Sequence, residues 1–219
     1  MSHIHILSKQ KSAANLFMRQ LRDIGAQKSR ANFRSNIEKI GQIIGYEISK
    51  TLDYNEVEIA TPLAKMNQDV LADEVVVVTI LRAGLPLHNG ILEVFPEADN
   101  GFISAYRKDN EQGGFTIEVE YVACPDITGK VLILNDPMLA TGRSFINAWE
   151  ALLKMGTPKS THIAAVIGSE EGVAYIKEHA PSDYQLWVAA VDPELNADKY
   201  IVPGLGDAGD LAFGTKLQH

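Results

Sequence analysis

The chain has 219 residues, of which 46% are hydrophobic and 22% charged, the composition of an ordinary globular protein. A chain of this length buries about 70% of its unfolded surface, so it needs no disulfide or metal ion to fold. Its formal net charge of −8 argues against a nucleic-acid partner, although small phosphorylated ligands remain possible.

The single cysteine, Cys124, excludes an internal disulfide and favours a reducing compartment. The amino-terminal sequence lacks the apolar segment of a signal peptide, and no apolar stretch approaches the roughly 18 residues of a membrane span. The six histidines lack the spacing of a zinc site. We therefore expect a cytoplasmic protein with no membrane partner and no metal bound directly by its side chains.

Residues 1–60 predict a helical addition at the amino terminus. One helix is expected over residues 12–24, ending at Gly25, and a second over residues 31–48. The second has apolar residues at spacings of three and four, which line one helix face: Phe33, Ile37, Ile40, Ile44 and Ile48. Three basic residues near its start form either a solvated face or a phosphate-binding effector patch: Lys28, Arg30 and Arg34.

Four continuous apolar runs follow, typical of strands buried on both faces: residues 74–81, 130–134, 162–167 and 185–191. Helical patterns over residues 145–155 and 170–179 lie between them. Strands that alternate with helices predict an α/β fold, a mostly parallel twisted sheet with helices on both faces.

A different pattern occupies residues 102–123. Apolar and polar residues alternate from Phe115 to Tyr121, after a polar turn, and predict a projecting β-hairpin arm. Such an arm either caps an active site or pairs with another subunit. No linker divides the chain, so residues 1–219 are expected to form one domain.

The strand at residues 130–134 is followed by a turn into a helix. An acidic residue at a strand end, before small residues at a helix amino terminus, suits a phosphorylated sugar. The candidate residues are Asp136, Pro137, Met138, Leu139, Ala140, Thr141, Gly142, Arg143 and Ser144. The alternative is an ordinary turn in which Thr141 or Ser144 merely caps the helix. No pattern typical of nucleoside triphosphatases is present.

Arg82-Ala83-Gly84 follows the strand at residues 74–81. An arginine with small neighbours there suits a diphosphate, and Arg107 at the base of the hairpin could supply a second cation. The alternative for either arginine is a structural salt bridge.

A third motif, Tyr200–Asp210, is rich in glycine. Its formal match to a dinucleotide-binding motif fails, because too few residues follow it to form the required βαβ unit. A backbone-rich loop remains, with Asp207 and Asp210 in it. Its main-chain N–H and C=O groups match the polar edge of a planar base.

Together these three strings resemble the uracil phosphoribosyltransferase family. The resemblance implies a type I phosphoribosyltransferase fold and formation of UMP and diphosphate from uracil and phosphoribosyl diphosphate (PRPP). It implies that Arg82 and Arg107 hold the diphosphate and that residues 136–144 hold the ribose 5-phosphate. Residues 196–219 would form the uracil loop and tail, reading uracil through Ile201, Gly206, Asp207 and Ala208.

In this resemblance the catalytic residues would be Asp136, Arg82 and Asp207. The Mg²⁺ cofactor would be carried by PRPP, with Asp207 near its bound water. The family also implies a homodimer or homotetramer and a possible GTP effector, for which Lys28, Arg30 and Arg34 are the candidates. Arg143 and Asn135 depart mildly from the common type I pattern. A non-catalytic nucleotide-binding regulator, or a salvage enzyme for another base, remains an alternative.

Overall fold

The computed structural model describes residues 3–109, 115–181 and 183–217, with only the backbone for residues 105–109 and 115–120. Within these residues an eight-stranded sheet runs in the order β1-β10-β9-β7-β4-β5-β6, with β8 paired to β9. All pairs are parallel except β5 with β6. The strands are β1 (Ile4–Ile6), β4 (Val75–Leu81), β5 (Asp99–Asp109), β6 (Phe115–Ala123), β7 (Val131–Asn135), β8 (Met138–Leu139), β9 (Ser160–Ser169) and β10 (Gln185–Asp192).

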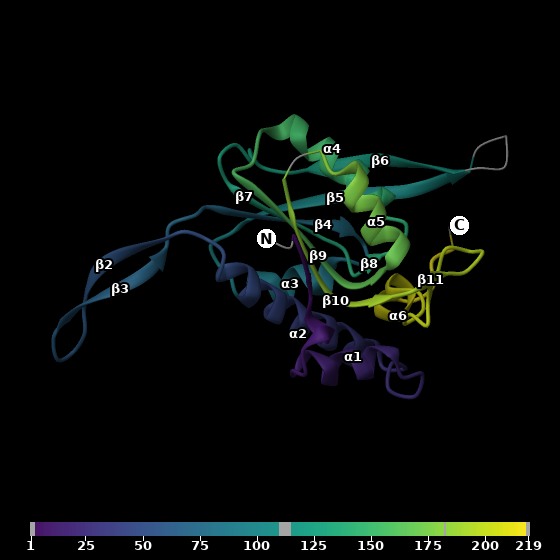
Figure 1. Ribbon diagram of the computed structural model, residues 1–219, viewed down its shortest axis with the longest axis horizontal. Coiled ribbons are helices and arrows are strands. Elements are labelled where there is room, and N and C mark those ends of the chain that lie inside the picture. Colours follow the sequence, from purple (N-terminus) through teal and green to yellow (C-terminus); the bar gives the residue numbers. More distant parts are fainter. Residues whose placement is uncertain (1–2, 110–114, 182, 218–219) are drawn as a thin grey trace.

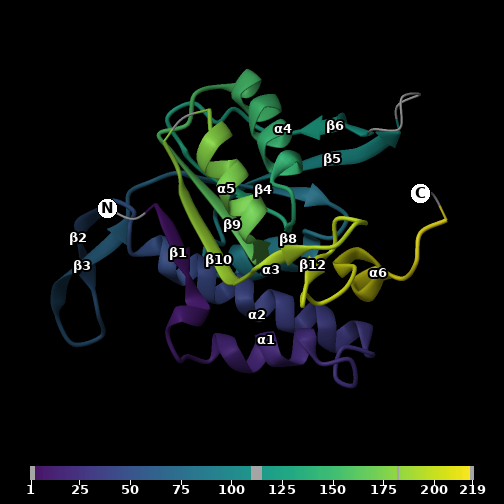
Figure 2. The same cartoon turned by 45° about the vertical axis from the view of Figure 1, so that its right-hand side comes forward.

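Helices cover both faces of this sheet (Figures 1 and 2). On one face lie α1 (Ala14–Arg22), α2 (Arg30–Ser49) and α3 (Leu85–Leu92). On the other lie α4 (Arg143–Leu152), continued by the 3₁₀ turn Leu153–Met155, and α5 (Glu170–His179). Successive residues of a strand point to opposite faces, so Val75 and Val77 join the first core while Val76 and Val78 join the second. The predicted α/β fold is confirmed.

Glycines bring α3 close to α2 and thereby fix the start of α3 beside the sheet. A Cβ atom at Gly90 would overlap the Glu38 carbonyl, and one at Gly41 would lie 2.5 Å from the Leu87 carbonyl oxygen. Ser29 caps α2 by accepting a hydrogen bond from the Asn32 amide at 3.3 Å. The loop that carries Arg82 directly precedes α3, so this packing positions it.

The prediction that residues 1–60 are helical is wrong at two places. Residues 4–6 form β1, which pairs with β10 at the sheet edge after a 3₁₀ turn at Leu7–Lys9 links it to the helices. β2 (Tyr54–Ala60) pairs with β3 (Lys65–Leu71) in a second hairpin, which projects from the body opposite the β5–β6 hairpin (Figure 1). β1 is too short to show a periodicity, and the β2–β3 hairpin buries no face that would leave a continuous apolar run.

An ion-pair cluster fixes the base of the β2–β3 hairpin. The Lys159 ammonium group lies 2.6 Å from Asp53 and also contacts Asp73. Asp73 in turn accepts a hydrogen bond from the Asp53 amide at 2.8 Å. The hairpin therefore leaves the sheet in a defined direction. No helix of the described part of the chain is long and apolar enough to cross a membrane.

Candidate functional site

Two of the predicted motifs meet because β4 and β7 are neighbours in the sheet. Thr79 pairs with Asn135 near the carboxyl ends of these parallel strands, so the loops that follow them start side by side. The Arg82 loop also passes very close to the sheet. A Cβ atom at Gly84 would overlap the Thr79 hydroxyl and lie 2.7 Å from the Ile80 carbonyl oxygen, so only glycine fits there.

The loop from Asp136 to Ser144 leads from β7 into α4 without a capping side chain. Gly142 holds the N-cap position in the left-handed region, with φ of 77°, and neither Thr141 nor Ser144 fills it. The alternative that these hydroxyls merely cap the helix therefore does not describe this turn. Uncapped amides at the start of a helix are well suited to an anion such as a phosphate. The guanidinium of Arg143 is exposed and lies over the Tyr175 ring, 5.0 Å from its centre.

Two residues at the junction of β9 and α5, which the sequence reasoning missed, support this loop. The Ser169 hydroxyl donates to the Ala140 carbonyl at 2.5 Å and accepts from the Gly172 amide at 2.8 Å. At Gly172 a Cβ atom would lie 2.6 Å from the Leu139 carbonyl oxygen and overlap that of Ala140. The position of Ser169 at the start of a helix could have marked it as an N-cap, but its contact with the loop depends on the pairing of β8 with β9.

The carboxyl-terminal motif was expected to be a loop throughout. It contains a short helix instead. β11 (Glu194–Leu195) pairs with β12 (Ile201–Val202), and α6 (Ala208–Phe213) follows. Asp207 caps α6 by accepting a hydrogen bond from the Asp210 amide at 2.8 Å. Ile201 and Ala208 are buried, whereas Gly206 is exposed in the turn between them. The spacing from Asp207 to Asp210 is a helix-start signal, which the glycine content of the motif concealed.

An ion pair between α1 and β10 anchors this motif at Gly204. Arg22 contacts both carboxylate oxygens of Asp192 at 2.7 Å and the Gly204 carbonyl at 3.0 Å. Asp192 also accepts from the Gly204 amide at 2.8 Å. Burial alone would raise the pKa of Asp192, but the hydrogen bonds from Arg22 and Gly204 lower it below its usual value. The sequence reasoning missed both residues of the pair, which lie 170 positions apart.

Replacing Arg22 by alanine is expected to destabilise the protein and loosen the carboxyl-terminal motif around Gly204. Asp192 is 8% exposed, so its carboxylate would lose its partner largely away from water, at a cost of about 1–3 kcal/mol. Because the pKa of Asp192 is lowered, this stabilisation is present above about pH 4, the unfolded value, and is lost as pH falls through the folded one. Urea denaturation at pH 7 and pH 3 measures it.

The control for Arg22→Ala is Arg19→Ala, which removes an exposed arginine from the same helix. Equal destabilisation by the two variants, or an Arg22→Ala effect that does not diminish at low pH, would contradict the assigned role of the Arg22–Asp192 pair.

The carboxylates of Asp136 and Asp207 lie close enough to influence each other. Asp136 is half-buried and accepts a hydrogen bond from the Met138 amide at 3.0 Å. Burial raises the pKa of Asp136 to about 7; the Met138 hydrogen bond opposes this, and the charge of Asp207 adds to it. This pair would gain from a nearby cation. Within the described residues no group of three or more metal-ligating side chains could hold a metal ion.

Arg82, from the loop after β4, contacts the same carboxyl-terminal segment as Asp207. Its Nη2 atom donates to Asp210 at 2.9 Å and to the Gly214 carbonyl at 2.8 Å. The salt bridge considered as an alternative for this arginine is therefore present. The backbone of Arg107 lies on β5, paired with Ile117, and its side chain is outside the described residues.

Two of the three predicted effector residues, Arg30 and Arg34, lie near α6 or its carboxyl end. The guanidinium of Arg34 donates to the Ala212 carbonyl at 2.6 Å and lies 5.9 Å from the centre of the Phe213 ring. Lys28 and Arg30 are exposed. Arg34 therefore fastens the helix that follows the glycine-rich turn.

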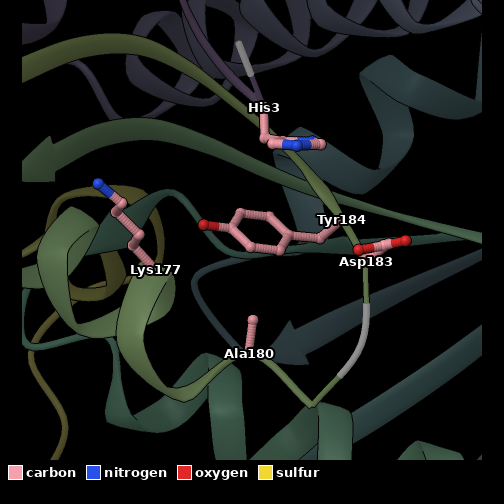
Figure 3. A pocket seen from close by; sticks show the side chains of 5 residues that line it. All are labelled: His3, Lys177, Ala180, Asp183 and Tyr184. Atoms are coloured by element: carbon pink, nitrogen blue, oxygen red, sulfur yellow. The ribbon is translucent and has the colours of Figure 1, made fainter. Parts of the chain in front are cut away.

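A separate hollow of about 370 Å³ lies away from these loops, between the start of β1, the end of α5 and the start of β10 (Figure 3). Its lining residues are His3, Lys177, Ala180, Asp183 and Tyr184. None of the predicted site residues is among them. The candidate site is instead the region where the β4, β7 and α6 loops converge.

Comparison with known proteins agrees with the three motifs. A family model described as uracil phosphoribosyltransferase matches residues 8–215. A uracil phosphoribosyltransferase from Porphyromonas gingivalis is 49% identical over 217 residues, covering 99% of this chain and 100% of that protein. One from Pyrococcus furiosus is 41% identical over 189 residues, covering 85% of this chain and 80% of that protein.

Solved structures agree with the fold. The AQ2163 protein from Aquifex aeolicus superposes with a TM-score of 0.85 at 30% identity, covering 98% of this chain and 100% of that one. A hypoxanthine phosphoribosyltransferase from Staphylococcus aureus, with a TM-score of 0.50 at 12% identity over 74% of this chain and 76% of that one, supports the fold alone. The resemblance inferred from three loops is confirmed, and the chain belongs to the uracil phosphoribosyltransferase family.

Proposed function

We propose that the protein transfers the 5-phosphoribosyl group of PRPP to N1 of uracil, forming UMP and diphosphate. The observation that carries this proposal is the convergence of an uncapped helix start with the carboxylates of Asp136 and Asp207. The amides of the Asp136–Ser144 loop are suited to the 5-phosphate, and Asp136 to the ribose hydroxyls. Membership of the family supports the choice of uracil as the base.

In the proposed reaction the N1–C1 bond forms as the bond from C1 to the diphosphate breaks. The electron pair of the broken bond leaves with the diphosphate, and the N1 proton of uracil passes to the departing diphosphate or to water. Positive charge develops on the ribose, where the Asp136 carboxylate stabilises it. Negative charge grows on the diphosphate, which Arg82 offsets and toward which Arg107 is expected to contribute from the family resemblance. Uracil is held by the main chain at Ile201, Gly206, Asp207 and Ala208, so positioning supplies much of the rate.

Mg²⁺ fits this site as an ion carried by PRPP. The neighbouring carboxylates of Asp136 and Asp207 favour a cation, and the family resemblance implies that Asp207 would contact its bound water. Such an ion would offset charge on the diphosphate.

Incubation with PRPP, Mg²⁺ and a panel of free bases tests the function. Release of diphosphate with uracil alone supports the proposal, whereas release with a different base makes the protein a salvage enzyme for that base. Binding of nucleotides without release indicates a non-catalytic regulator on the same fold.

We further propose a homodimer or homotetramer in which the β2–β3 hairpin contacts a second copy. The pairing of β2 with β3 places Val57, Ile59, Met66 and Val70 on one face, and each is 37% to 46% exposed. The other face carries polar groups, including the Glu58–Lys65 ion pair at 2.7 Å. A two-stranded hairpin with an exposed apolar face is marginally stable alone, so a partner surface is expected.

Substituting both Val57 and Ile59 by glutamate is expected to convert this oligomer to a smaller species. Charges on the apolar face would have to be buried without partners. Light scattering coupled to size-exclusion chromatography measures the mass, and the pair Glu56→Gln with Glu58→Gln, on the opposite face, is the control. A wild-type monomer, or an unchanged mass in the glutamate variant, would contradict the proposal.

A GTP effector at Lys28, Arg30 and Arg34 stays a prediction. Because Arg34 contacts the Ala212 carbonyl on α6, an anion bound there could alter the uracil side of the site. A GTP titration of the initial rate tests this, and an unchanged rate would remove the idea. A cytoplasmic location likewise stays a prediction.

A further inference from the structure

Asp210 joins the proposed diphosphate loop at Arg82 to α6, the short helix within the proposed uracil loop and tail. Its carboxylate accepts a hydrogen bond from Nη2 of Arg82 at 2.9 Å, and the same Nη2 atom donates to Gly214 at the far end of α6 at 2.8 Å. The two loops are otherwise far apart in sequence, separated by 128 positions at this contact. The proposed function assigns no role to Asp210.

The contacts with Asp210 and Gly214 use only one nitrogen atom of the Arg82 guanidinium group. Arginine has five donors in a planar fork, and within the described residues Nη2 alone takes part in these hydrogen bonds. The Arg82 side chain is 39% exposed, so the group also retains accessible surface. Asp210 thus restrains the orientation of Arg82 while leaving donors for an anion.

The first turn of α6 packs directly against the arginine loop. A Cβ atom at Gly209 would lie 3.8 Å from both the Arg82 Nε atom and the Ala83 Cβ atom. Asp207, which caps α6, accepts a hydrogen bond from the Asp210 amide at 2.8 Å. A shift of the cap residue would therefore move the carboxylate that holds Arg82.

We propose that Asp210 is a positioning residue that holds Arg82 for the diphosphate and couples the uracil loop to the diphosphate loop. The proposal rests on the role of Arg82 in the proposed function. Asp210 touches neither substrate and acts through the guanidinium that it orients. Ordering of either loop then favours ordering of the other, because both depend on the same contact.

Inhibition by diphosphate tests this proposal. Asp210→Ala is expected to raise the inhibition constant for diphosphate and the KM for PRPP about fivefold to tenfold, as for loss of a partly exposed charged hydrogen bond. Asp210→Asn, which keeps an acceptor oxygen, is expected to recover part of the loss. In an Arg82→Ala background Asp210→Ala should have no further effect, because the two residues act as a unit.

The matched control is Asp198→Ala, which removes an exposed carboxylate from the turn between β11 and β12. If Asp210→Ala weakens diphosphate inhibition no more than this control, or weakens it equally with and without Arg82, Asp210 does not position Arg82. If Arg82→Ala itself leaves diphosphate inhibition unchanged, the role of Arg82 in the proposed function fails instead. Retained inhibition with loss of uracil affinity alone would reduce Asp210 to a structural residue of α6.

Discussion

Asp136→Ala is expected to lower kcat by about 10²–10³-fold while the protein still folds. The carboxylate lies at the end of β7, beside the loop proposed to hold the ribose phosphate, where it can offset positive charge that develops on the ribose. No other described carboxylate follows β7 directly, and the neighbouring Asp207 is engaged as the cap of α6, so no neighbour is expected to replace it. Steady-state kinetics with PRPP and uracil measure the loss, circular dichroism checks folding, and near-normal turnover would disprove the role.

The raised pKa of Asp136 also makes its carboxylate form destabilising, so this residue favours catalysis at the expense of stability. With a folded pKa of about 7, the native protein keeps a proton between roughly pH 4 and 7 that the unfolded chain releases. Stability therefore falls as pH rises through this window. Asp136→Asn, which retains the acceptor for the Met138 amide, should remove the penalty and raise the free energy of unfolding at pH 8 by roughly 2–4 kcal/mol.

Thermal denaturation distinguishes this effect from general stabilisation. The Asp136→Asn gain should be present at pH 8 and absent near pH 4, where the native carboxyl is already protonated. Asp198→Asn, at an exposed site, should leave the free energy of unfolding unchanged at both pH values. The wild-type kcat/KM should also rise with pH around an apparent pKa near 7, a value that belongs to the free enzyme. An equal stability gain at both pH values would contradict the assigned pKa.

Gly172→Ala is expected to weaken PRPP binding about tenfold to a hundredfold and to destabilise the protein by about 1–3 kcal/mol. The added Cβ atom meets two backbone carbonyls, those of Leu139 and Ala140, which cannot move without displacing the loop proposed to hold the phosphate. The helix start itself would remain, because Ser169 still caps α5.

Gly168→Ala is the matched control, four residues earlier on β9. Its Cβ atom would make ordinary contacts of 3.5 Å or more with the side chains of Val188 and Leu139. Calorimetric titration with PRPP and urea denaturation measure both effects. If Gly172→Ala binds PRPP as tightly as Gly168→Ala does, the loop tolerates displacement and the support from α5 has no role in binding.

The buried strands and main helices were predictable because their signals are local. The predicted runs at residues 74–81 and 185–191 correspond to β4 and β10, and residues 170–179 to α5. A strand buried on both faces has to be apolar along its length, so its sequence reports its environment. The β2–β3 hairpin has no such constraint and was missed.

In the candidate site, too, the segments with local signals were predictable and the long-range contacts were not. The candidate loops at residues 82–84, 136–144 and 200–210 were identified from the sequence because each is a continuous segment, with its arginine, glycines or acidic residues at short spacing. The residues that support these loops were not identified from the sequence. They are Arg22 with Asp192, and Ser169 with Gly172, which contact the Ala140 carbonyl. These residues have ordinary alternative explanations as surface charge, helix cap or helix glycine.

The sequence by itself determined that this chain forms a mostly parallel α/β sheet of the uracil phosphoribosyltransferase family, and it identified the three loops that are proposed to carry its chemistry. Only the tertiary structure decided how those loops face one another and what holds them: the contact between Arg82 and Asp210, the coupled charges of Asp136 and Asp207, and the projecting β2–β3 hairpin. The physical reason is range. Burial and loop chemistry are set by neighbouring residues, whereas charge coupling and anchoring depend on distances between segments that only the folded chain brings together.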